Sequence, residues 1–188
     1  NPKTQTDKNF DYYLDYQFNK KWNSGAQVTT GVTFEHIRYD SAVMDEIYKS
    51  DNIAAFLQYD QRFWDRLSVS AGVRAEYYRV NNHHREAETK IFGTKVPFRP
   101  VFRAGLNYQL ADYSFIRASF GQGYRNPSIN EKYLRKDIGG VGVYPNLDIK
   151  PEKGFNAELG FKQGYKIGNF QGFVDVAGFY TQYKDMVE

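Results

Sequence analysis

The run LSVSAGVRAEYYRV, Leu67–Val80, decides the fold, because apolar residues occupy alternate positions along it. The odd positions from Leu67 to Tyr77 are apolar, and the even positions from Ser68 to Tyr78 are polar or small. Successive side chains of a β-strand point to opposite faces, so a period of two predicts a strand. The run therefore predicts a strand with one face in lipid and the other in a polar lumen.

The same alternation recurs along the chain and predicts about eight strands. In the first strand the even positions from Phe10 to Phe18 are apolar, with polar residues between them. In the last strand Asp175 disturbs the pattern of Phe173 and Phe179, so its facing stays open. The predicted strands cover residues 9–18, 26–39, 52–63, 67–80, 97–110, 114–125, 154–163 and 170–183.

The predicted connections alternate between short and long. Short connections cover residues 19–25, 64–66, 111–113 and 164–169, and long ones cover 40–51, 81–96 and 126–153. Membrane barrels have short periplasmic turns and longer extracellular loops, so we expect the long loops to face outside. Strands of about ten or more residues exceed the length usual in soluble sheets and match a tilted membrane strand. A soluble β-sandwich or propeller stays open as the alternative.

The predicted fold class is all-β: an antiparallel transmembrane β-barrel segment of about eight strands. The unpaired edges of such a segment are aggregation templates. We therefore expect a curved, open sheet that belongs to a larger closed wall, without hydrogen bonds between the first and last strands. Nothing at Asn1 resembles a signal peptide and Glu188 does not resemble a natural end, so we interpret the chain as processed, truncated or partly represented.

The composition argues against several other classes of protein. No stretch of the 188 residues approaches the roughly 18 consecutive apolar residues that a helical membrane span needs. Aromatic residues make up 18% of the chain and are mostly Tyr and Phe, which suits the wet ends of a membrane wall. A formal net charge of +3, spread along the chain, gives nucleic-acid binding no support. No G-x-S-x-G elbow or comparable nucleophile setting is present, which argues against an outer-membrane hydrolase. We predict that the protein is not an enzyme and has no cofactor.

Two blocks of sequence carry a family resemblance: SFGQGYRNPSINEKYL (Ser119–Leu134) and YPNLDIKPEKGFNAELGFKQG (Tyr144–Gly164). Their order and spacing resemble the barrel of TonB-dependent outer-membrane receptors. In that family a G-x-G-[FY]-R-x-P segment enters a loop with an E-x-Y motif, followed by N-x-x-L-x-P-E and a strand with E-x-G. The matching residues are Gly121, Gly123, Tyr124, Arg125, Pro127, Glu131, Tyr133, Asn146, Leu147, Pro151, Glu152, Glu158 and Gly160.

The resemblance implies a receptor that binds a scarce nutrient outside the cell, such as an iron chelate, cobalamin or a glycan, and imports it with energy from TonB. Residues 1–188 would then form part of a barrel of about 22 strands, without the plug domain and the remaining strands. The implied location is the bacterial outer membrane. The implied partners are outer-membrane lipid, the plug, the TonB complex, the extracellular ligand and a surface lipoprotein. A passive porin or adhesin, and a soluble all-β binding module, stay open as alternatives.

Candidate ligand-binding residues lie in the predicted outer loops and the upper lumen. Aromatic rings offer stacking faces, while Arg and Lys suit acidic groups on an iron chelate or a glycan. The candidates are Tyr78, Arg125, Asn126, Tyr133, Arg135, Lys136 and Tyr144.

Charged residues on the predicted inward face form a second candidate group. Arg74, Arg103 and Arg117 fall at comparable depths on three successive predicted strands. The carboxylates of Glu76 and Glu158 are placed to neutralise the charge of these arginines. The resemblance implies that a plug supplies further counter-charges, with Glu158 as the best plug-facing carboxylate. A solvated inner face that neutralises itself is the alternative.

Three smaller features have both a functional and a plain interpretation. Gly121 and Gly123 would let a plug or loop backbone approach the inner wall closely, unless they belong to ordinary turn and bulge chemistry.

The pair His83 and His84, with acidic residues nearby at Glu86 and Glu88, could bind a metal or haem iron. Adjacent histidines in an extended loop point apart, so we expect a polar loop and predict no metal site. The glycines of residues 139–142 resemble a phosphate loop, but no helix start follows them.

Overall fold

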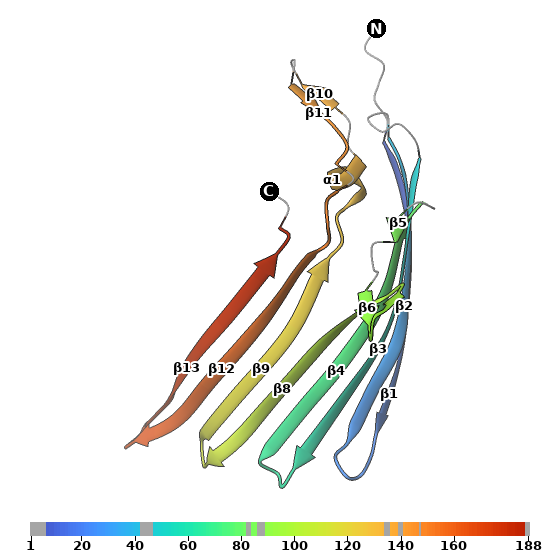
Figure 1. Cartoon of the computed structure of the whole chain (residues 1–188). Coiled ribbons are helices and arrows are strands. Elements are labelled where there is room, and N and C mark those ends of the chain that lie inside the picture. Colours follow the sequence, from blue (N-terminus) through green and yellow to red (C-terminus); the bar gives the residue numbers. More distant parts are fainter. Residues whose placement is uncertain are drawn as a thin grey trace.

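The structure is a computed structural model that describes residues 7–41, 47–81, 84–85, 89–133, 136–138, 141–146 and 148–186. Eight long antiparallel strands form one curved wall (Figure 1). In the order of the sheet they are β1 (Lys8–Lys21), β2 (Gln27–Asp40), β3 (Tyr48–Phe63), β4 (Leu67–Val80), β8 (Arg99–Ala111), β9 (Ser114–Arg125), β12 (Glu152–Ile167) and β13 (Phe170–Lys184). The strand prediction is confirmed.

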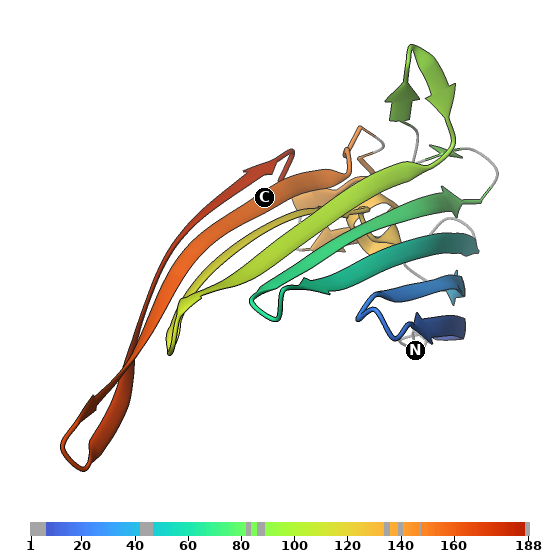
Figure 2. The ribbon, with the colours of Figure 1, turned by 90° about the horizontal axis from the view of Figure 1, so that it is seen from below.

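The wall is open, because β1 and β13 occupy its opposite edges. Figure 2 shows the strands side by side from below, with the β12–β13 hairpin extending beyond the others. This hairpin extends further because the β9–β12 pairing ends at Ser114 and Gln163, while β12 and β13 remain paired to Ile167 and Phe170. The expectation of an open section, rather than a self-closed barrel of eight strands, is therefore confirmed.

The long connections contain short elements that alternation alone did not predict. They are β5 (His84–Arg85), β6 (Thr89–Ile91), β7 (Thr94–Val96), the helix α1 (Ile129–Tyr133), β10 (Lys136–Ile138) and β11 (Val141–Val143). The predicted boundaries differ most at two places: β3 begins at Tyr48 rather than residue 52, and β12 continues to Ile167 rather than residue 163. Pairing with neighbouring strands holds these extra residues in the ladder, whether or not their side chains alternate.

The register assigns each side chain to one of two faces, because directly paired residues point the same way. Val73 pairs with Leu57 and with Phe102, so these side chains share the apolar outward face. Gly72 pairs with Gln58 and Arg103, which share the polar inward face. The same rule settles the facing of β13: Asp175 pairs with Lys162, which stands in register with inward Phe115 of β9.

Connection length separates the two ends of the wall. The turns of β1–β2, β3–β4, β8–β9 and β12–β13 all lie at one end, which we name the short-turn end, and the other connections lie at the long-loop end (Figure 1). At the β3–β4 turn the backbone φ angles of Trp64 and Asp65 are both positive, at 48° and 54°. Two such residues suit the right-handed twist of a hairpin. Which end faces outside the cell stays a prediction.

Most large apolar side chains lie exposed on the wall, as expected for a surface that meets lipid rather than a second protein layer. Four of the six buried apolar residues of the described chain gather instead at the long-loop end. Tyr48 and Val80 form this core with Ile129 and Tyr133 of α1. The core therefore positions a loop helix against the wall.

Among the described residues, no helix is long and apolar enough to cross a lipid bilayer.

Candidate functional site

Arg125, the last residue of β9, joins the long loop to the wall. Its guanidinium donates to both carboxylate oxygens of Glu131 in α1, at 2.9 and 3.0 Å. It also donates to both oxygens of Glu152, the first residue of β12, at 3.1 and 2.9 Å. Paired hydrogen bonds between Arg and a carboxylate fix orientation as well as distance. The loop between Arg125 and Glu152 is thus tied at its two ends and at its helix.

A capping box begins α1. The Ser128 amide donates to Glu131 Oε2 at 2.7 Å, and the Glu131 amide donates to Ser128 Oγ at 3.2 Å, so each residue satisfies the other's backbone donor. Hydrogen bonds from Arg125, followed by the bond from the Ser128 amide, lower the pKa of Glu131 to about 2. Glu131 is therefore ionised at neutral pH. We name Arg125, Ser128, Glu131 and Glu152 the rim cluster.

The opposite side of α1 is apolar and packs against the inward face of β3 and β4 at the long-loop end. Tyr133, which is 8% exposed, stacks on Tyr48 with ring centroids 4.3 Å apart. Ile129 and Val80 complete the cluster, and Tyr78 packs against it. The helix follows β9 in the chain but contacts the inward side of β3 and β4. The rim cluster and these aromatic contacts therefore hold it from two sides.

The far part of the long loop returns to the same helix. The Asn146 amide donates to the Lys132 carbonyl at 3.0 Å. The Asn146 side chain accepts a hydrogen bond from the Asp148 amide at 3.1 Å, which forms a local turn. Five of the motif residues quoted for the family resemblance thus converge around α1: Arg125, Glu131, Tyr133, Asn146 and Glu152.

A second charged group lies in the middle of the wall. Arg117 of β9 donates to Glu158 of β12 at 3.0 Å and to both oxygens of Asp175 of β13, at 2.8 and 3.0 Å. Gly160 is the direct partner of Arg117 in the register, and a Cβ there would lie 2.7 Å from the guanidinium carbon. Glycine leaves the space that lets the arginine cross β12. We name Arg117, Glu158 and Asp175 the mid-wall network.

The other two predicted inward arginines bind neutral or more distant groups. Arg103 crosses over Gly72, where a Cβ would lie 3.1 Å from its Nε, and donates to Gln58. Arg74 donates to Thr33 Oγ1 at 3.1 Å and lies 3.8 Å from Glu76. The inner wall itself therefore partners each of the three arginines.

The pairing of β8 with β9 is incomplete at the long-loop end of the wall. Their described ladder ends at the pair Arg103 and Gly121. Beyond it, the Gln122 side chain accepts a hydrogen bond from the Phe102 amide at 3.2 Å, in the place of a backbone carbonyl. Tyr124 then donates to Glu76 across the gap. This opening gives side chains of β9 access to β4.

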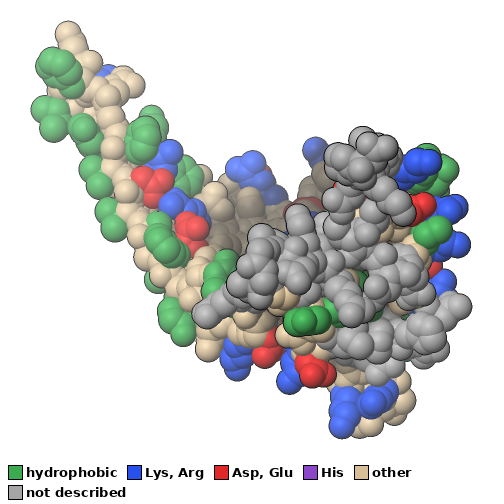
Figure 3. All heavy atoms as spheres, turned by 90° about the horizontal axis from the view of Figure 1, so that it is seen from above, with side chains coloured by type: hydrophobic (Ala, Val, Ile, Leu, Met, Phe, Trp, Pro, Cys, Tyr) green, Lys and Arg blue, Asp and Glu red, His purple; other side chains and the backbone are tan. Residues whose placement is uncertain are grey.

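Two hollows follow the concave face. One, of about 600 Å³, lies toward the short-turn end and is lined by residues that include Arg117 and Glu158. The other, of about 500 Å³, is lined by Gly121, Gly123 and Asn156, among others. A Cβ at either glycine would meet nothing within 4 Å. Seen from above, charged side chains of the β12–β13 hairpin lie on the concave side of the wall, and hydrophobic side chains lie along the opposite side of the hairpin (Figure 3). The inner face is thus polar and open to a close-fitting partner.

The structure brings some predicted ligand residues together and separates others. Arg125, Tyr133 and Tyr78 meet at α1, where their described contacts hold the helix. Tyr144 is 72% exposed and faces solvent. Arg135 lies outside the described residues, and for Lys136 only the backbone is described. The ligand-binding role of all these residues, and of Asn126, stays a prediction.

The histidine cluster lies mostly outside the described chain. His83, Glu86 and Glu88 are not described, and His84 is described only as part of β5. Among the described residues, no group of three or more His, Cys or acidic side chains is placed to hold a metal.

Sequence reasoning missed three residues of these sites. Ser128 had a readable signal, because Ser-x-x-Glu is the pattern of a capping box. Glu131 was quoted in a motif without a role. Asp175 had no signal in its own strand, since its partner Arg117 lies two strands away in the sheet.

An antiparallel wall with an apolar outward face, a polar concave face and loops anchored at one end defines a class: sections of large membrane β-barrels. A family model described as "TonB dependent receptor-like, beta-barrel" matches residues 1–188. The chain belongs to this family, whose members are receptors and transporters rather than enzymes.

Similar proteins agree with this assignment. Hemoglobin-haptoglobin utilization protein B of Neisseria meningitidis is 26% identical over 132 residues, which cover 66% of this chain and 16% of that protein. The hemophore receptor HasR of Serratia marcescens, solved with its hemophore HasA and heme, has a TM-score of 0.66 at 14% identity, over 95% of this chain and 33% of HasR. The FrpB iron transporter of Neisseria meningitidis has a TM-score of 0.63 at 14% identity, over 96% of this chain and 30% of FrpB. The chain thus spans a third or less of each of these proteins.

Proposed function

We propose that this chain forms part of the wall of an outer-membrane receptor that captures an iron-bearing nutrient, with haem or a haem protein as the first candidate, and imports it with TonB-derived energy. The names of the similar proteins support this ligand class, since they refer to haemoglobin, to a hemophore with heme, and to iron. Family membership supports the energy source.

The double attachment of α1 is the observation that carries the proposal. The rim cluster and the Tyr48–Tyr133 contact hold one loop across the inward side of β3 and β4, where a ligand would enter the lumen. A receptor needs binding groups on a fixed support, because ordering a loop on binding costs affinity.

Within this proposal the residues have two roles. Ligand contacts come from the anchored loop, through Asn126, Arg135, Lys136 and Tyr144, while Arg125, Tyr78 and Tyr133 position it. The inward charges Arg74, Glu76, Arg103, Arg117 and Glu158 face the plug domain. The mid-wall network leaves donors and acceptors of this face accessible from the concave side.

Growth of the source bacterium on limiting iron tests the proposal. A strain lacking the full-length receptor would be supplied with haem, haemoglobin or a ferric chelate as the iron source, and complemented with the wild-type gene. We expect the deletion to abolish growth on one haem source, and deletion of TonB to give the same loss. Normal growth of the deletion strain on every iron source would contradict the proposal.

A pair of exposed tyrosines supplies a matched control. Tyr144 in the loop and Tyr113 in a turn at the short-turn end are 72% and 73% exposed. Tyr144→Ala should weaken ligand binding by the full-length receptor, measured by titration calorimetry, because a stacking face is lost. Tyr113→Ala should leave binding unchanged. Equal effects of the two changes on ligand binding would show that the loop is not part of the binding surface.

A further inference from the structure

The ladder between β8 and β9 stops before the long-loop end, although both strands continue. Its last direct pair is Arg103 and Gly121. Each strand keeps its other neighbour up to its own end, because β8 stays paired with β4 and β9 with β12. The gap is therefore local to these two strand ends. We name residues 99–102 of β8 and 122–125 of β9 the seam.

Pro100 explains why the ladder stops. The Phe102 amide faces β9, since it donates to the Gln122 side chain at 3.2 Å. Backbone groups of a strand face the same neighbour at every second residue, so residue 100 faces β9 as well. Proline has no amide hydrogen to donate there, and proline within a sheet marks an edge or a bulge. The sequence thus places an edge inside the wall at this point.

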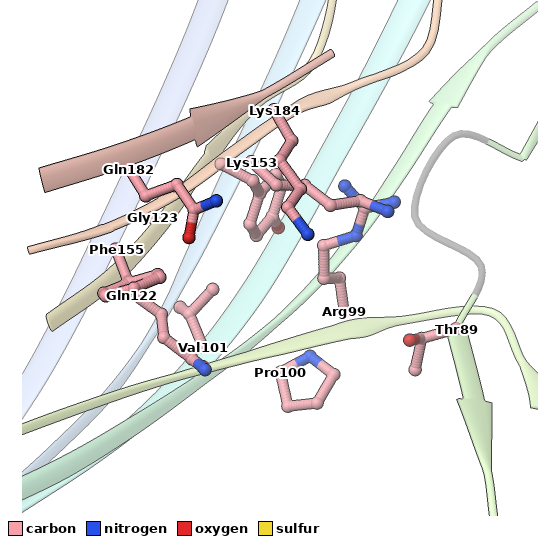
Figure 4. A pocket seen from close by; sticks show the side chains of 12 residues that line it. Thr89, Arg99, Pro100, Val101, Gln122, Gly123, Lys153, Phe155, Gln182 and Lys184 are labelled. Carbon is pink, nitrogen blue, oxygen red and sulfur yellow. The ribbon is translucent and has the colours of Figure 1, made fainter.

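Side chains, rather than a backbone ladder, hold the seam closed. Tyr124 of β9 donates to Glu76 of β4, and the Arg99 guanidinium of β8 lies 4.8 Å from the centre of the Tyr124 ring. A hollow of about 350 Å³ lies between the two strand ends, and Figure 4 shows Pro100 and Gln122 on its two sides. Opening the seam therefore breaks side-chain contacts without breaking a ladder.

Helix α1 joins the two sides of the seam. On the β9 side, Arg125 donates to Glu131 at 2.9 and 3.0 Å. On the other side, Tyr133 stacks on Tyr48 of β3, with Val80 of β4 in the same cluster. The helix follows β9 in the chain but packs on β3 and β4. It therefore connects the two parts of the wall at the level where the ladder does not.

Two glycines leave the end of β9 free to move. Gly121 is the last ladder residue, and Gly123 follows it on the same face. A Cβ at either position would meet nothing within 4 Å. Hinges form where a few residues, often small ones, absorb a change in backbone angles. The end of β9 can thus turn away from β8 together with the end of β12.

We infer that the seam between β8 and β9 opens at the long-loop end during nutrient import, and that α1 holds it closed until then. Opening widens the lumen at this end for a ligand bound at the anchored loop. The purpose of the opening rests on the proposed function, but the opening itself is measured without a ligand.

Spin-label distances in the purified full-length receptor, in phosphatidylcholine bilayers, test the role of α1. Labels at Lys49→Cys of β3 and Lys184→Cys of β13 lie on either side of the seam at the long-loop end. Labels at Trp64→Cys and Phe170→Cys, where the side chains are 81% and 80% exposed, span the same strands at the short-turn end. Tyr133→Ala should shift the first distance to longer values and leave the second unchanged. An unchanged first distance would overturn the inference.

A conservative change gives a second measurement. Tyr124→Phe removes only the hydroxyl that reaches Glu76 and keeps the ring beside Arg99. It should shift the first distance in the same direction by a smaller amount. Tyr180→Phe, an exposed tyrosine of β13, should produce no shift. Equal shifts from the two changes would mean that the wall loosens generally and has no seam.

A cross-link tests whether import needs the opening. Val101→Cys and Gly123→Cys, on the two sides of the seam, would be joined by a short bifunctional maleimide and the product checked by mass spectrometry. Gly105→Cys and Ser119→Cys, direct partners in the ladder, are the matched control. The seam cross-link should abolish TonB-dependent uptake of haem iron and leave ligand binding intact, and the control should leave both intact.

Uptake through the cross-linked seam equal to that of the control would overturn the inference. The two proposals also fail separately. A receptor whose seam opens in Tyr133→Ala but that imports no iron in its wild-type form overturns the proposed function only. A receptor that imports haem iron with its seam cross-linked overturns the seam only.

Discussion

Two arginines on the inward face of β9 bind carboxylates in the same way, yet they hold different parts of the molecule. Arg117 lies in the middle of the strand and joins Glu158 and Asp175 of the next two strands. Arg125 lies at the strand's end and joins Glu152 of the wall to Glu131 of a loop helix. The first ties strand to strand, and the second ties loop to wall.

The surroundings of the two arginines explain this difference. Arg117 needs Gly160 beneath it, because a side chain there would block its path across β12. Arg125 needs no such space, since Glu152 is its direct partner in the register and Glu131 comes from the loop beyond the end of the ladder. Instead the helix it binds gains an apolar contact on its other side, through Tyr133. Changes at these supporting residues should therefore separate wall stability from loop position.

Tyr133→Ala should have the largest effect, confined to the loop. Loss of a buried ring that stacks on Tyr48 costs about 3 kcal/mol of the free energy that holds α1 in place. Amide hydrogen exchange at residues 129–133 of the full-length receptor should become much faster, while the unfolding midpoint of the barrel stays unchanged.

The matched control for this change is Tyr144→Ala. Tyr144 is exposed, so its removal should leave exchange at α1 as in wild type. If Tyr133→Ala instead lowered the barrel midpoint and left exchange at α1 unchanged, the rim would be part of the wall and the comparison would fail.

Gly160→Ala should produce the opposite result. A methyl group 2.7 Å from the Arg117 guanidinium carbon forces the arginine away from Glu158 and Asp175, and such overpacking costs about 1–3 kcal/mol. The barrel midpoint should fall while exchange at α1 remains slow. Gly121→Ala, on the same face with nothing within 4 Å, should be neutral. Equal midpoints for the two variants would show that the mid-wall network does not stabilise the wall.

The wall could be predicted from sequence because its physics is local and repeated. In Leu67–Val80 every second residue meets the same surroundings, so alternation alone gives the strand and its faces. The motif residues around Arg125 could be located by resemblance, but not their contacts. Alternation could not place Asp175, since its facing follows from its register pairing with Lys162, and its ion-pair partner Arg117 lies in β9.

The loop could not be predicted in the same way. Helix α1 has five residues, too few to show a helical period, and β10 and β11 have three each. The helix is stabilised by its cap and by Tyr48 and Val80, which are distant in sequence. Only the Ser128-x-x-Glu131 pattern was readable beforehand, and it sets the helix start without indicating which face packs on the wall.

Ser128→Ala should have a smaller effect than Gly160→Ala or Tyr133→Ala. Loss of a helix N-cap costs about 1 kcal/mol, and here Arg125 still holds Glu131. Exchange at α1 should rise modestly, and Ser128→Thr should restore it because the hydroxyl is kept. An effect as large as that of Tyr133→Ala would mean that the cap, and not the aromatic contact, holds the helix.

The smallest effect expected near neutral pH is that of pH itself on the rim cluster. Hydrogen bonds from Arg125 and the Ser128 amide lower the pKa of Glu131 from 4.5 to about 2. A group whose pKa is lowered by folding contributes stability above its unfolded pKa and loses it as the pH falls toward the folded one. The attachment of α1 should thus be constant from pH 7 to about 5 and weaken between 4.5 and 2.

Carbon-13 NMR of the Glu131 carboxyl group in the full-length receptor measures this directly. The titration midpoint should lie near 2 in wild type and move up toward 4.5 in Arg125→Gln, because the hydrogen bonds that lower the pKa of Glu131 most are then removed. Arg117→Gln, on the same face of the same strand, should leave the Glu131 midpoint where it was. If both changes moved it equally, the two arginines would belong to one electrostatic system, and loop position would depend on the wall's own charges.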